Sequence, residues 1–96
     1  MIKSFQSKAA QNIYDGAISR HARKIPLALH PKIRRLFDQI NAATKIETLN
    51  VPPGNHLEKL KGNLKNYWSV RINKQRRIIF IWTNGDTHHL NIIDYH

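Results

Sequence analysis

The second half of the chain holds four short segments that are rich in Ile, Val and aromatic residues and lie too close together for helical connections. These segments are residues 57–61, 67–73, 76–82 and 88–95. Asn84-Gly85 separates the last two, and this pair favours a two-residue hairpin because both positions accept a positive φ at low cost. The spacing therefore predicts antiparallel hairpins rather than parallel strands joined by helices.

The hairpin turn also predicts which residues of the last two segments face each other. Counting outward from Thr83 opposite Asp86 gives the pairs Ile81–His88, Ile79–Leu90 and Arg77–Ile92. Directly opposed residues share one face of a sheet, and every second residue along a strand shares that face too. We therefore expect Arg77, Asp94 and His96 to project from the same face.

The first half of the chain shows apolar residues at helical spacing in two stretches. The first stretch begins after Ser7, which can cap a helix, and continues through Ile18. The second covers residues 29–43. Its start stays open, because both Pro26 and Pro31 are tolerated in a first helical turn.

Between the two halves the helical spacing is lost. Residues 45–55 show no periodicity, and Pro52-Pro53-Gly54 predicts a turn. Residues 2–6 alternate briefly and favour a short opening strand. A chain of 96 residues is long enough for one domain and too short for two. The expected fold is α+β, with two N-terminal helices packed on a mainly antiparallel sheet of four to five strands, in one domain over residues 1–96.

The charge balance points to an anionic partner. Sixteen Lys and Arg against six Asp and Glu give a net charge of +10, which a polyanion or an acidic protein would screen, although solubility alone is a competing explanation. The absence of cysteine excludes disulfides, thiolate nucleophiles and zinc–thiolate sites. No apolar signal segment or membrane-length apolar run is present, so we expect a cytoplasmic protein without membrane contact.

One basic stretch contains the residue types that cleave RNA. Seven basic side chains and no acidic one lie in it, namely Lys59, Lys61, Lys65, Arg71, Lys74, Arg76 and Arg77. RNA can be cleaved without a metal when a base takes the 2′-hydroxyl proton, an acid protonates the leaving oxygen, and fixed cations stabilise the phosphorane. His56 and His96 are candidates for proton transfer because imidazole titrates near neutral pH.

Structural roles compete with several of these functional interpretations. A histidine in a loop or at a chain end is most often a solvated residue. Lys59 and Lys61 also fit a solvated strand edge, and Asp94 also fits a salt bridge. Arg77 is harder to assign to a structural role, because a charged group on an apolar-flanked strand needs an anionic partner.

Aromatic and histidine residues in the same half have similar alternatives. Trp68 and Trp82 are more typical of a core than of a base-stacking surface, which leaves Tyr95 as the stacking candidate. His88 and His89 point to opposite faces of a strand and have no third ligand nearby in the sequence. No metal site is therefore expected.

Three sequence blocks carry a resemblance to a known family. They are P-P-G-N-H-L-E-K-L-K-G at 52–62, W-S-V-R-I-N-K-Q-R-R-I-I-F-I-W at 68–82 and I-I-D-Y-H at 92–96. Together they resemble the HigB toxins of the RelE/ParE superfamily of bacterial toxin–antitoxin systems. The resemblance implies the RelE-like fold, in which two N-terminal helices pack on a strongly curved antiparallel sheet.

The resemblance also implies an activity and partners. It implies a toxin that enters the ribosomal A site, contacts mRNA and ribosomal RNA, cuts the translated mRNA without a cofactor and inhibits translation. A helix-turn-helix antitoxin similar to HigA would neutralise it, and operator DNA would be contacted only through that antitoxin. Two other functions fit the same fold: a ParE-like gyrase-inhibiting toxin and a non-catalytic basic partner of a repressor.

The family's functional residues can be carried onto matching positions. They fall on His56, Lys59, Arg77, Asp94, Tyr95 and His96. By resemblance, Lys59 and Arg77 stabilise the scissile phosphate, a histidine and Asp94 handle protons, and Tyr95 contacts a base. Which histidine is the base stays open. The expected RNA-binding residues are Lys61, Lys65, Arg71, Lys74 and Arg76.

Two positions depart from the family pattern. Arg76 stands where an aromatic residue is common, and Asn91 stands where an acidic residue is usual.

Overall fold

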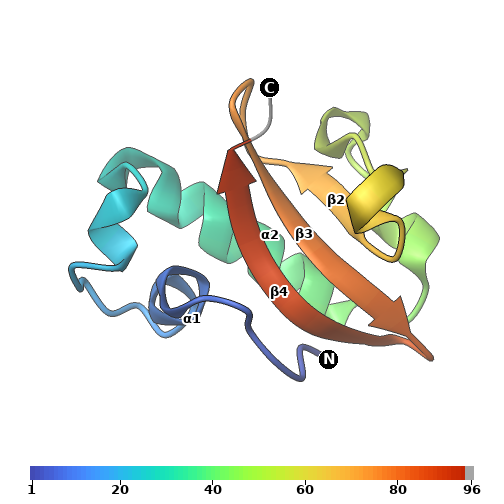
Figure 1. Ribbon diagram of the computed structural model, residues 1–96, viewed down its shortest axis with the longest axis horizontal. Helices are drawn as coiled ribbons and strands as arrows, with labels where there is room; N and C mark the ends of the chain where they lie inside the picture. Colours follow the sequence, from blue (N-terminus) through green and yellow to red (C-terminus); the bar gives the residue numbers. More distant parts are fainter. Residues whose placement is uncertain (95–96) are drawn as a thin grey trace.

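Two helices pack against one face of a four-stranded antiparallel sheet in the computed structural model, which describes residues 1–94 (Figure 1). The helices are α1 (Lys8–Tyr14) and α2 (His30–Ala42), and the strands are β1 (Glu58–Lys59), β2 (Trp68–Arg71), β3 (Arg76–Thr83) and β4 (Asp86–Asp94). The strands are hydrogen-bonded in their sequence order. This arrangement confirms the predicted α+β class and the predicted hairpins.

Helix α1 starts where the sequence predicts and ends earlier. The Ser7 hydroxyl accepts a hydrogen bond from the Ala10 N–H at 3.1 Å and caps the first turn. The helix stops at Tyr14, because Gly16 takes a positive φ of 76° and turns the chain. The predicted continuation to Ile18 is wrong, and the Ile18 side chain is 65% exposed.

Helix α2 resolves the open question about its start. It begins at His30 and places Pro31 in its first turn. The buried His30 ring brings Nε2 within 3.0 Å of the Ala22 and Ile25 carbonyl oxygens. Because two acceptors face the same nitrogen, Nε2 carries the proton and donates to the segment between the helices.

The core fills the space between the helices and the sheet. Its fully buried large side chains include Ile13, Ile33, Phe37, Ile40, Val70, Ile78, Phe80 and Leu90. Phe5, Tyr14 and Phe37 form an aromatic group with ring centroids 5.4 to 6.2 Å apart. Trp68 and Trp82 pack against the core, as expected for these residues. No helix within residues 1–94 is long and apolar enough to cross a bilayer.

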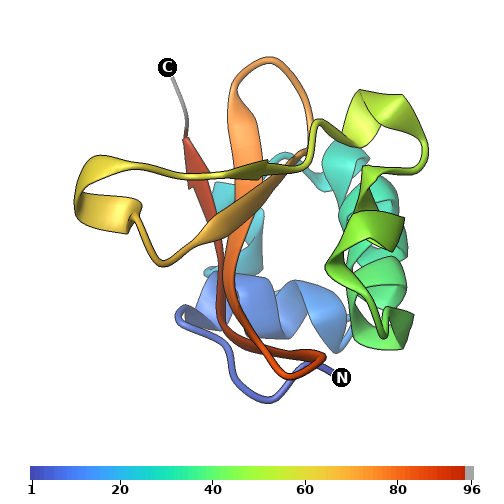
Figure 2. The same ribbon diagram turned by 90° about the vertical axis from the view of Figure 1, so that its right-hand side faces the viewer.

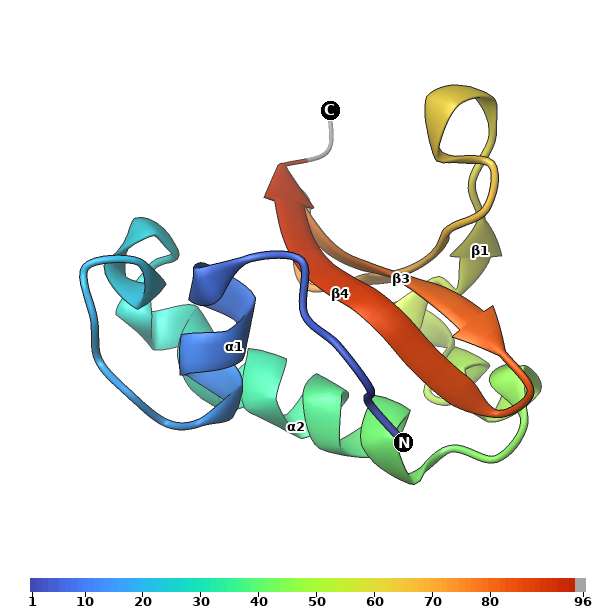
Figure 3. The same ribbon diagram turned by 60° about the horizontal axis from the view of Figure 1, so that its bottom comes forward.

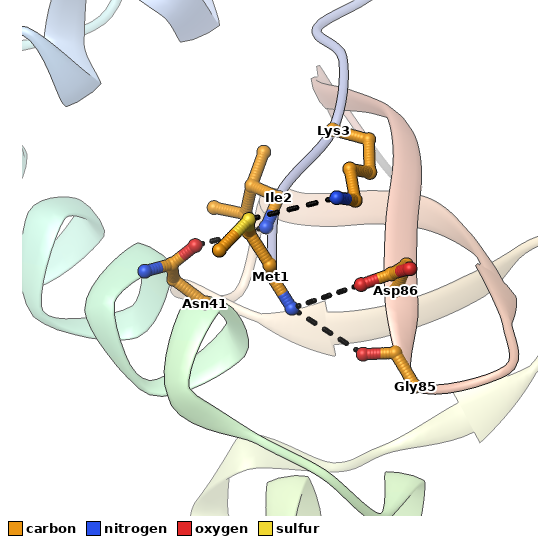
Figure 4. A network of polar contacts seen from close by, with 6 residues as sticks. All are labelled: Met1, Ile2, Lys3, Asn41, Gly85 and Asp86. Atoms are coloured by element: carbon orange, nitrogen blue, oxygen red, sulfur yellow. Dashed lines mark hydrogen bonds and ion pairs between the residues drawn. The ribbon is translucent and has the colours of Figure 1, made fainter.

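The N-terminal segment lies along the edge of β4 that is not paired with β3. Ile2 and Phe5 form isolated parallel bridges with Thr87 and Leu90, so the expected opening strand exists only in part. Figure 4 shows the adjoining polar contacts: the terminal ammonium lies 3.5 Å from the Asp86 carboxylate and 3.3 Å from the Gly85 carbonyl oxygen. The segment therefore covers a sheet edge that would otherwise be open.

The β3–β4 pairing follows the prediction near the turn and departs from it farther along. The predicted pairs Thr83–Asp86 and Ile81–His88 are present, whereas the far end pairs Ile79–Asn91, Arg77–Ile93 and Arg76–Asp94. One extra β4 residue is accommodated opposite Phe80, where His89 adopts a φ of 55° and donates its N–H to the Ser4 hydroxyl at 2.9 Å. The predicted pairs Ile79–Leu90 and Arg77–Ile92 are therefore wrong.

The sheet is strongly curved. Figure 2 shows α2 on one side of the β3–β4 hairpin and the β1–β2 connection on the other. In Figure 3 the end of β4 and the β1–β2 connection rise on the same side of the sheet. The face turned away from the helices is consequently concave, and we call it the outer face.

Candidate active site

Arg77 lies on the outer face near the start of β3 and is held by several neighbours. Its Nη1 lies 2.9 Å from Glu58 Oε1 and donates to Ser69 Oγ at 3.0 Å and to the His56 carbonyl oxygen at 3.3 Å. The Arg77 side chain is 14% exposed, and Ser69 is fully buried. Strands β1 and β2 and the loop before β1 thus fix the direction of one guanidinium. Glu58 and Ser69 were not singled out from the sequence, because their role depends on cross-strand pairing.

A second arginine stands directly across the sheet. Arg71 of β2 and Arg77 of β3 are paired residues of adjacent strands. Like charges in this arrangement repel each other, and an anion bound between them would offset the repulsion. Arg71 Nε donates to the Asn73 carbonyl oxygen at 3.2 Å, which orients its guanidinium. The outer face therefore presents paired cations suited to a phosphodiester.

The loop before β1 places His56 beside Arg77. Asn55 is buried, and its Nδ2 donates to the Leu49 and Val51 carbonyl oxygens at 3.0 and 3.2 Å. Gln39 of α2 donates to the same Val51 oxygen at 2.6 Å, which ties the loop to the helix. His56 follows with a left-handed φ of 47° and an exposed side chain. An asparagine after Pro-Pro-Gly is the signal that could have identified Asn55 as a loop anchor.

Lys59 is placed differently from Arg77. It follows Glu58 in β1, and consecutive strand residues point to opposite faces. Its Nζ lies 5.2 Å from the centroid of the Trp68 ring, in a cation–π contact. The structure therefore brings the His56 backbone to Arg77 and turns Lys59 toward the other face of the sheet.

Asp94 also departs from its expected position. Because of the extra residue in β4, it lies opposite Arg76 and not on the Arg77 face. Its Oδ1 is 3.3 Å from Arg76 Nε. The expectation that Arg77 and Asp94 share a face is wrong. Tyr95 and His96, which were expected beside them, lie outside the described residues.

The remaining basic candidates border the same sheet. Lys61 and Lys65 are exposed on the β1–β2 connection, and Lys74 is exposed in the β2–β3 turn. Lys61 also lines a cleft of about 360 Å³ with Glu58, Lys59, Leu60 and Leu64. Within residues 1–94, no three His, Asp or Glu side chains gather closely enough to hold a metal ion.

Comparison with known proteins identifies the family. Residues 3–96 match the family described as the RelE-like toxin of the type II toxin–antitoxin system HigB. Toxin HigB-1 of Vibrio cholerae serotype O1 is 39% identical over 85 residues, which cover 88% of this chain and 87% of the relative. Endoribonuclease HigB of Proteus vulgaris is 33% identical over 96 residues, and both chains are fully covered.

Solved structures share the fold. The YoeB dimer from Staphylococcus aureus superposes with a TM-score of 0.58 at 24% identity, covering 99% of this chain and 97% of that one. A heterotetrameric YoeB–YefM toxin–antitoxin complex from the same species superposes with a TM-score of 0.54 at 17% identity. The match covers 100% of this chain and 98% of that one. Fold, length and sequence agree, and the chain belongs to the HigB-like family of RelE-like toxins in type II toxin–antitoxin systems.

Proposed function

We propose that this toxin is a ribosome-dependent endoribonuclease that cuts translated mRNA without a metal and so inhibits translation. The observation that carries the proposal is the fixed Arg77 guanidinium on the concave face, with Arg71 across from it and the backbone of His56 beside it. The name of the Proteus vulgaris relative, Endoribonuclease HigB, supports the same activity.

The proposed chemistry assigns a role to each cation. A base takes the proton of an RNA 2′-hydroxyl, the 2′-oxygen attacks the adjacent phosphorus, and the 5′-oxygen leaves with a proton from an acid. Arg77 binds the phosphate and stabilises the negative charge of the phosphorane. Arg71 adds a second positive charge that stabilises the same phosphorane. Lys59 reaches the same phosphate after its ammonium leaves the Trp68 ring. This move costs little, because a cation–π contact at an exposed site contributes only about 0.5–1 kcal/mol.

Proton transfer is proposed for the histidines and the end of the chain. The backbone carbonyl of His56 accepts a hydrogen bond from Arg77, and the exposed His56 imidazole serves as one of the two proton-transfer groups. His96 supplies the other, and Tyr95 stacks on a base of the mRNA. Lys61, Lys65 and Lys74 bind flanking mRNA or ribosomal RNA, as their exposure on two loops allows.

We also propose a helix-turn-helix antitoxin similar to HigA as the partner that neutralises the toxin in the cytoplasm. The fold is shared with a toxin found in a complex with its antitoxin, which supports the pairing. Co-purification with the product of the adjacent reading frame tests it. A neighbouring product that neither binds the toxin nor suppresses its toxicity would contradict it.

Induced expression in bacteria tests the activity. Arg77→Ala and His96→Gln are expected to restore growth, because each removes a group that acts on the scissile phosphate or its protons. Lys45→Gln, a charge change at an exposed residue beyond α2, is the matched control and should stay toxic. Unchanged toxicity of the folded Arg77→Ala protein would refute the site. Growth arrest with intact mRNA and inhibited gyrase would favour the ParE-like function instead.

A further inference from the structure

A cleft of about 580 Å³ lies at the end of β4, away from the Arg77 face. Its charged and titratable lining consists of Lys8, His21, Lys24, Arg76 and Asp94. Ala9, Ile25 and Ile92 contribute apolar surface. The volume falls within the roughly 300–1,000 Å³ typical of small-ligand clefts, and the mixture of cations and apolar surface suits a base with its phosphate.

The cations of this cleft exceed its one carboxylate. Lys8, Lys24 and Arg76 face a single acidic group, Asp94. Lys8 and Lys24 are exposed, and neither forms an ion pair with another residue in the range 1–94. Two ammonium groups are thus available to an anion.

Arg76 is incompletely satisfied by its neighbours. Its side chain is 15% exposed, and its Nε makes no hydrogen bond within residues 1–94. Asp94 Oδ1 lies 3.3 Å away as an ion pair without hydrogen-bond geometry, and the Asp94 side chain is 55% exposed. A half-exposed carboxylate of this kind is a weak competitor for an incoming phosphate.

His21 responds to the same cations. The pKa of His21 lies below its ordinary value of 6.5, because of desolvation and the nearby charges of Arg20, Lys8 and Lys24. An anion that enters the cleft would screen these charges and let the imidazole take up a proton.

We propose that this cleft binds one nucleotide of the substrate RNA beyond the scissile phosphate, with Lys8 and Lys24 on its phosphate and its base against Ile25 and Ile92. The proposal rests on the ribonuclease function given above. It also rests on the placement of Arg76 and Arg77, which are consecutive and point to opposite faces. An RNA strand that leaves Arg77 over the end of the sheet therefore meets this cleft next. An acidic peptide has no reason to follow that path.

Binding of a short RNA that cannot be cleaved tests the proposal. The probe is a fluorescein-labelled, fully 2′-O-methylated RNA oligonucleotide, and the readout is anisotropy at several salt concentrations. The double variant Lys8→Gln/Lys24→Gln should bind about tenfold more weakly, because a phosphate loses two charged donors. The slope of the logarithm of the association constant against the logarithm of the salt concentration should become shallower by about 0.7 for each phosphate that the variant no longer neutralises.

A charge-matched double variant is the control. Lys3→Gln/Lys45→Gln removes two exposed lysines near the other end of β4, where Ile2 pairs with Thr87 and the Thr44 carbonyl oxygen approaches Gly85. It should bind almost as wild type does. Equal weakening by both double variants, or wild-type binding by both, would overturn the proposal. Wild-type RNA binding combined with weakened antitoxin binding in the cleft variant would overturn it too, in favour of a protein partner.

The pH dependence gives a second readout. Because an anion raises the lowered pKa of His21, the wild-type protein should bind the probe more tightly as the pH falls from 8 to 6. The other groups around His21 are the cations Arg20, Lys8, Lys24 and Arg76 and the carboxylate of Asp94. His21→Gln should flatten the pH profile, and an unchanged profile in that variant would contradict the role of His21.

The proposal and the ribonuclease function can fail separately. If ribosome-bound mRNA stays uncut while the cleft variants still weaken RNA binding, the ribonuclease function is wrong and the cleft stands as an RNA site. If mRNA is cut equally by wild type and the cleft variant, and RNA binding is also equal, only the cleft proposal is wrong.

Discussion

Arg77 shows how a single residue could be identified from the sequence while its partners could not. A charged residue within an apolar strand requires an anionic or polar partner, so its importance is visible without a structure. Its contacts with Glu58, Ser69 and the His56 carbonyl oxygen depend on how three segments pair. Under the proposed function, the Glu58 carboxylate, 2.9 Å from Arg77 Nη1, occupies the position that the scissile phosphate would take.

The proposed function therefore predicts that Glu58 competes with the RNA phosphate for Arg77. Glu58→Gln should bind uncleavable RNA about two- to fivefold more tightly, in line with the roughly 0.5–1 kcal/mol of a partly exposed ion pair. Anisotropy against Glu47→Gln, an exposed glutamate outside the sheet, measures the difference. Unchanged or weaker RNA binding by Glu58→Gln would show that the carboxylate does not occupy the phosphate position.

At the scale of elements, the turn of the β3–β4 hairpin was predictable and its far end was not. Asn84-Gly85 encodes a local turn, and the Ser7 cap is equally local. The extra residue at His89 depends on a hydrogen bond to Ser4, which lies 85 residues away in the chain. The position of Asp94 follows from that bulge, so the shared face expected for Arg77 and Asp94 could not be corrected from sequence alone.

The Ser4 contact can be tested directly. Ser4→Ala removes the acceptor of the His89 N–H and should lower the free energy of unfolding by about 0.5–1.5 kcal/mol. Urea denaturation measures the change. Faster amide hydrogen exchange is expected at His89 and its neighbours in β4. A variant with unaltered stability and exchange would mean that the bulge does not depend on Ser4.

The loop before β1 offers a second test at this scale. Asn55→Ala removes the Nδ2 hydrogen bonds to the Leu49 and Val51 carbonyl oxygens, and although Gln39 still donates to Val51, the Leu49 oxygen loses its buried donor, so the free energy of unfolding should fall by about 1–3 kcal/mol. Cleavage should fall as well, because the loop positions His56. Asn50→Ala, at an exposed position nearby, should change neither stability nor cleavage. Equal behaviour of the two variants would refute the anchoring role of Asn55.

At the scale of the whole molecule, three arginines proposed to contact RNA, namely Arg71, Arg76 and Arg77, lie at one end of the sheet. The start of β3 directs Arg77 to the outer face and Arg76 to the cleft beside α1. The opposite end carries the Asn84-Gly85 turn and the N-terminal segment. A net charge of +10 indicated an anionic partner, but only the folded chain places the cations on two faces of one strand end.

Ribosome-dependent cleavage is tested most directly by mapping RNA ends after the purified toxin is incubated with ribosomes that are translating a defined mRNA. Wild type should make discrete cuts without added metal beyond what the ribosomes need, and it should leave the naked mRNA uncut. Arg77→Ala should cut at a rate at least about 100-fold lower. Intact mRNA with wild-type toxin, or equal cutting by the folded Arg77→Ala variant, would contradict the proposed function.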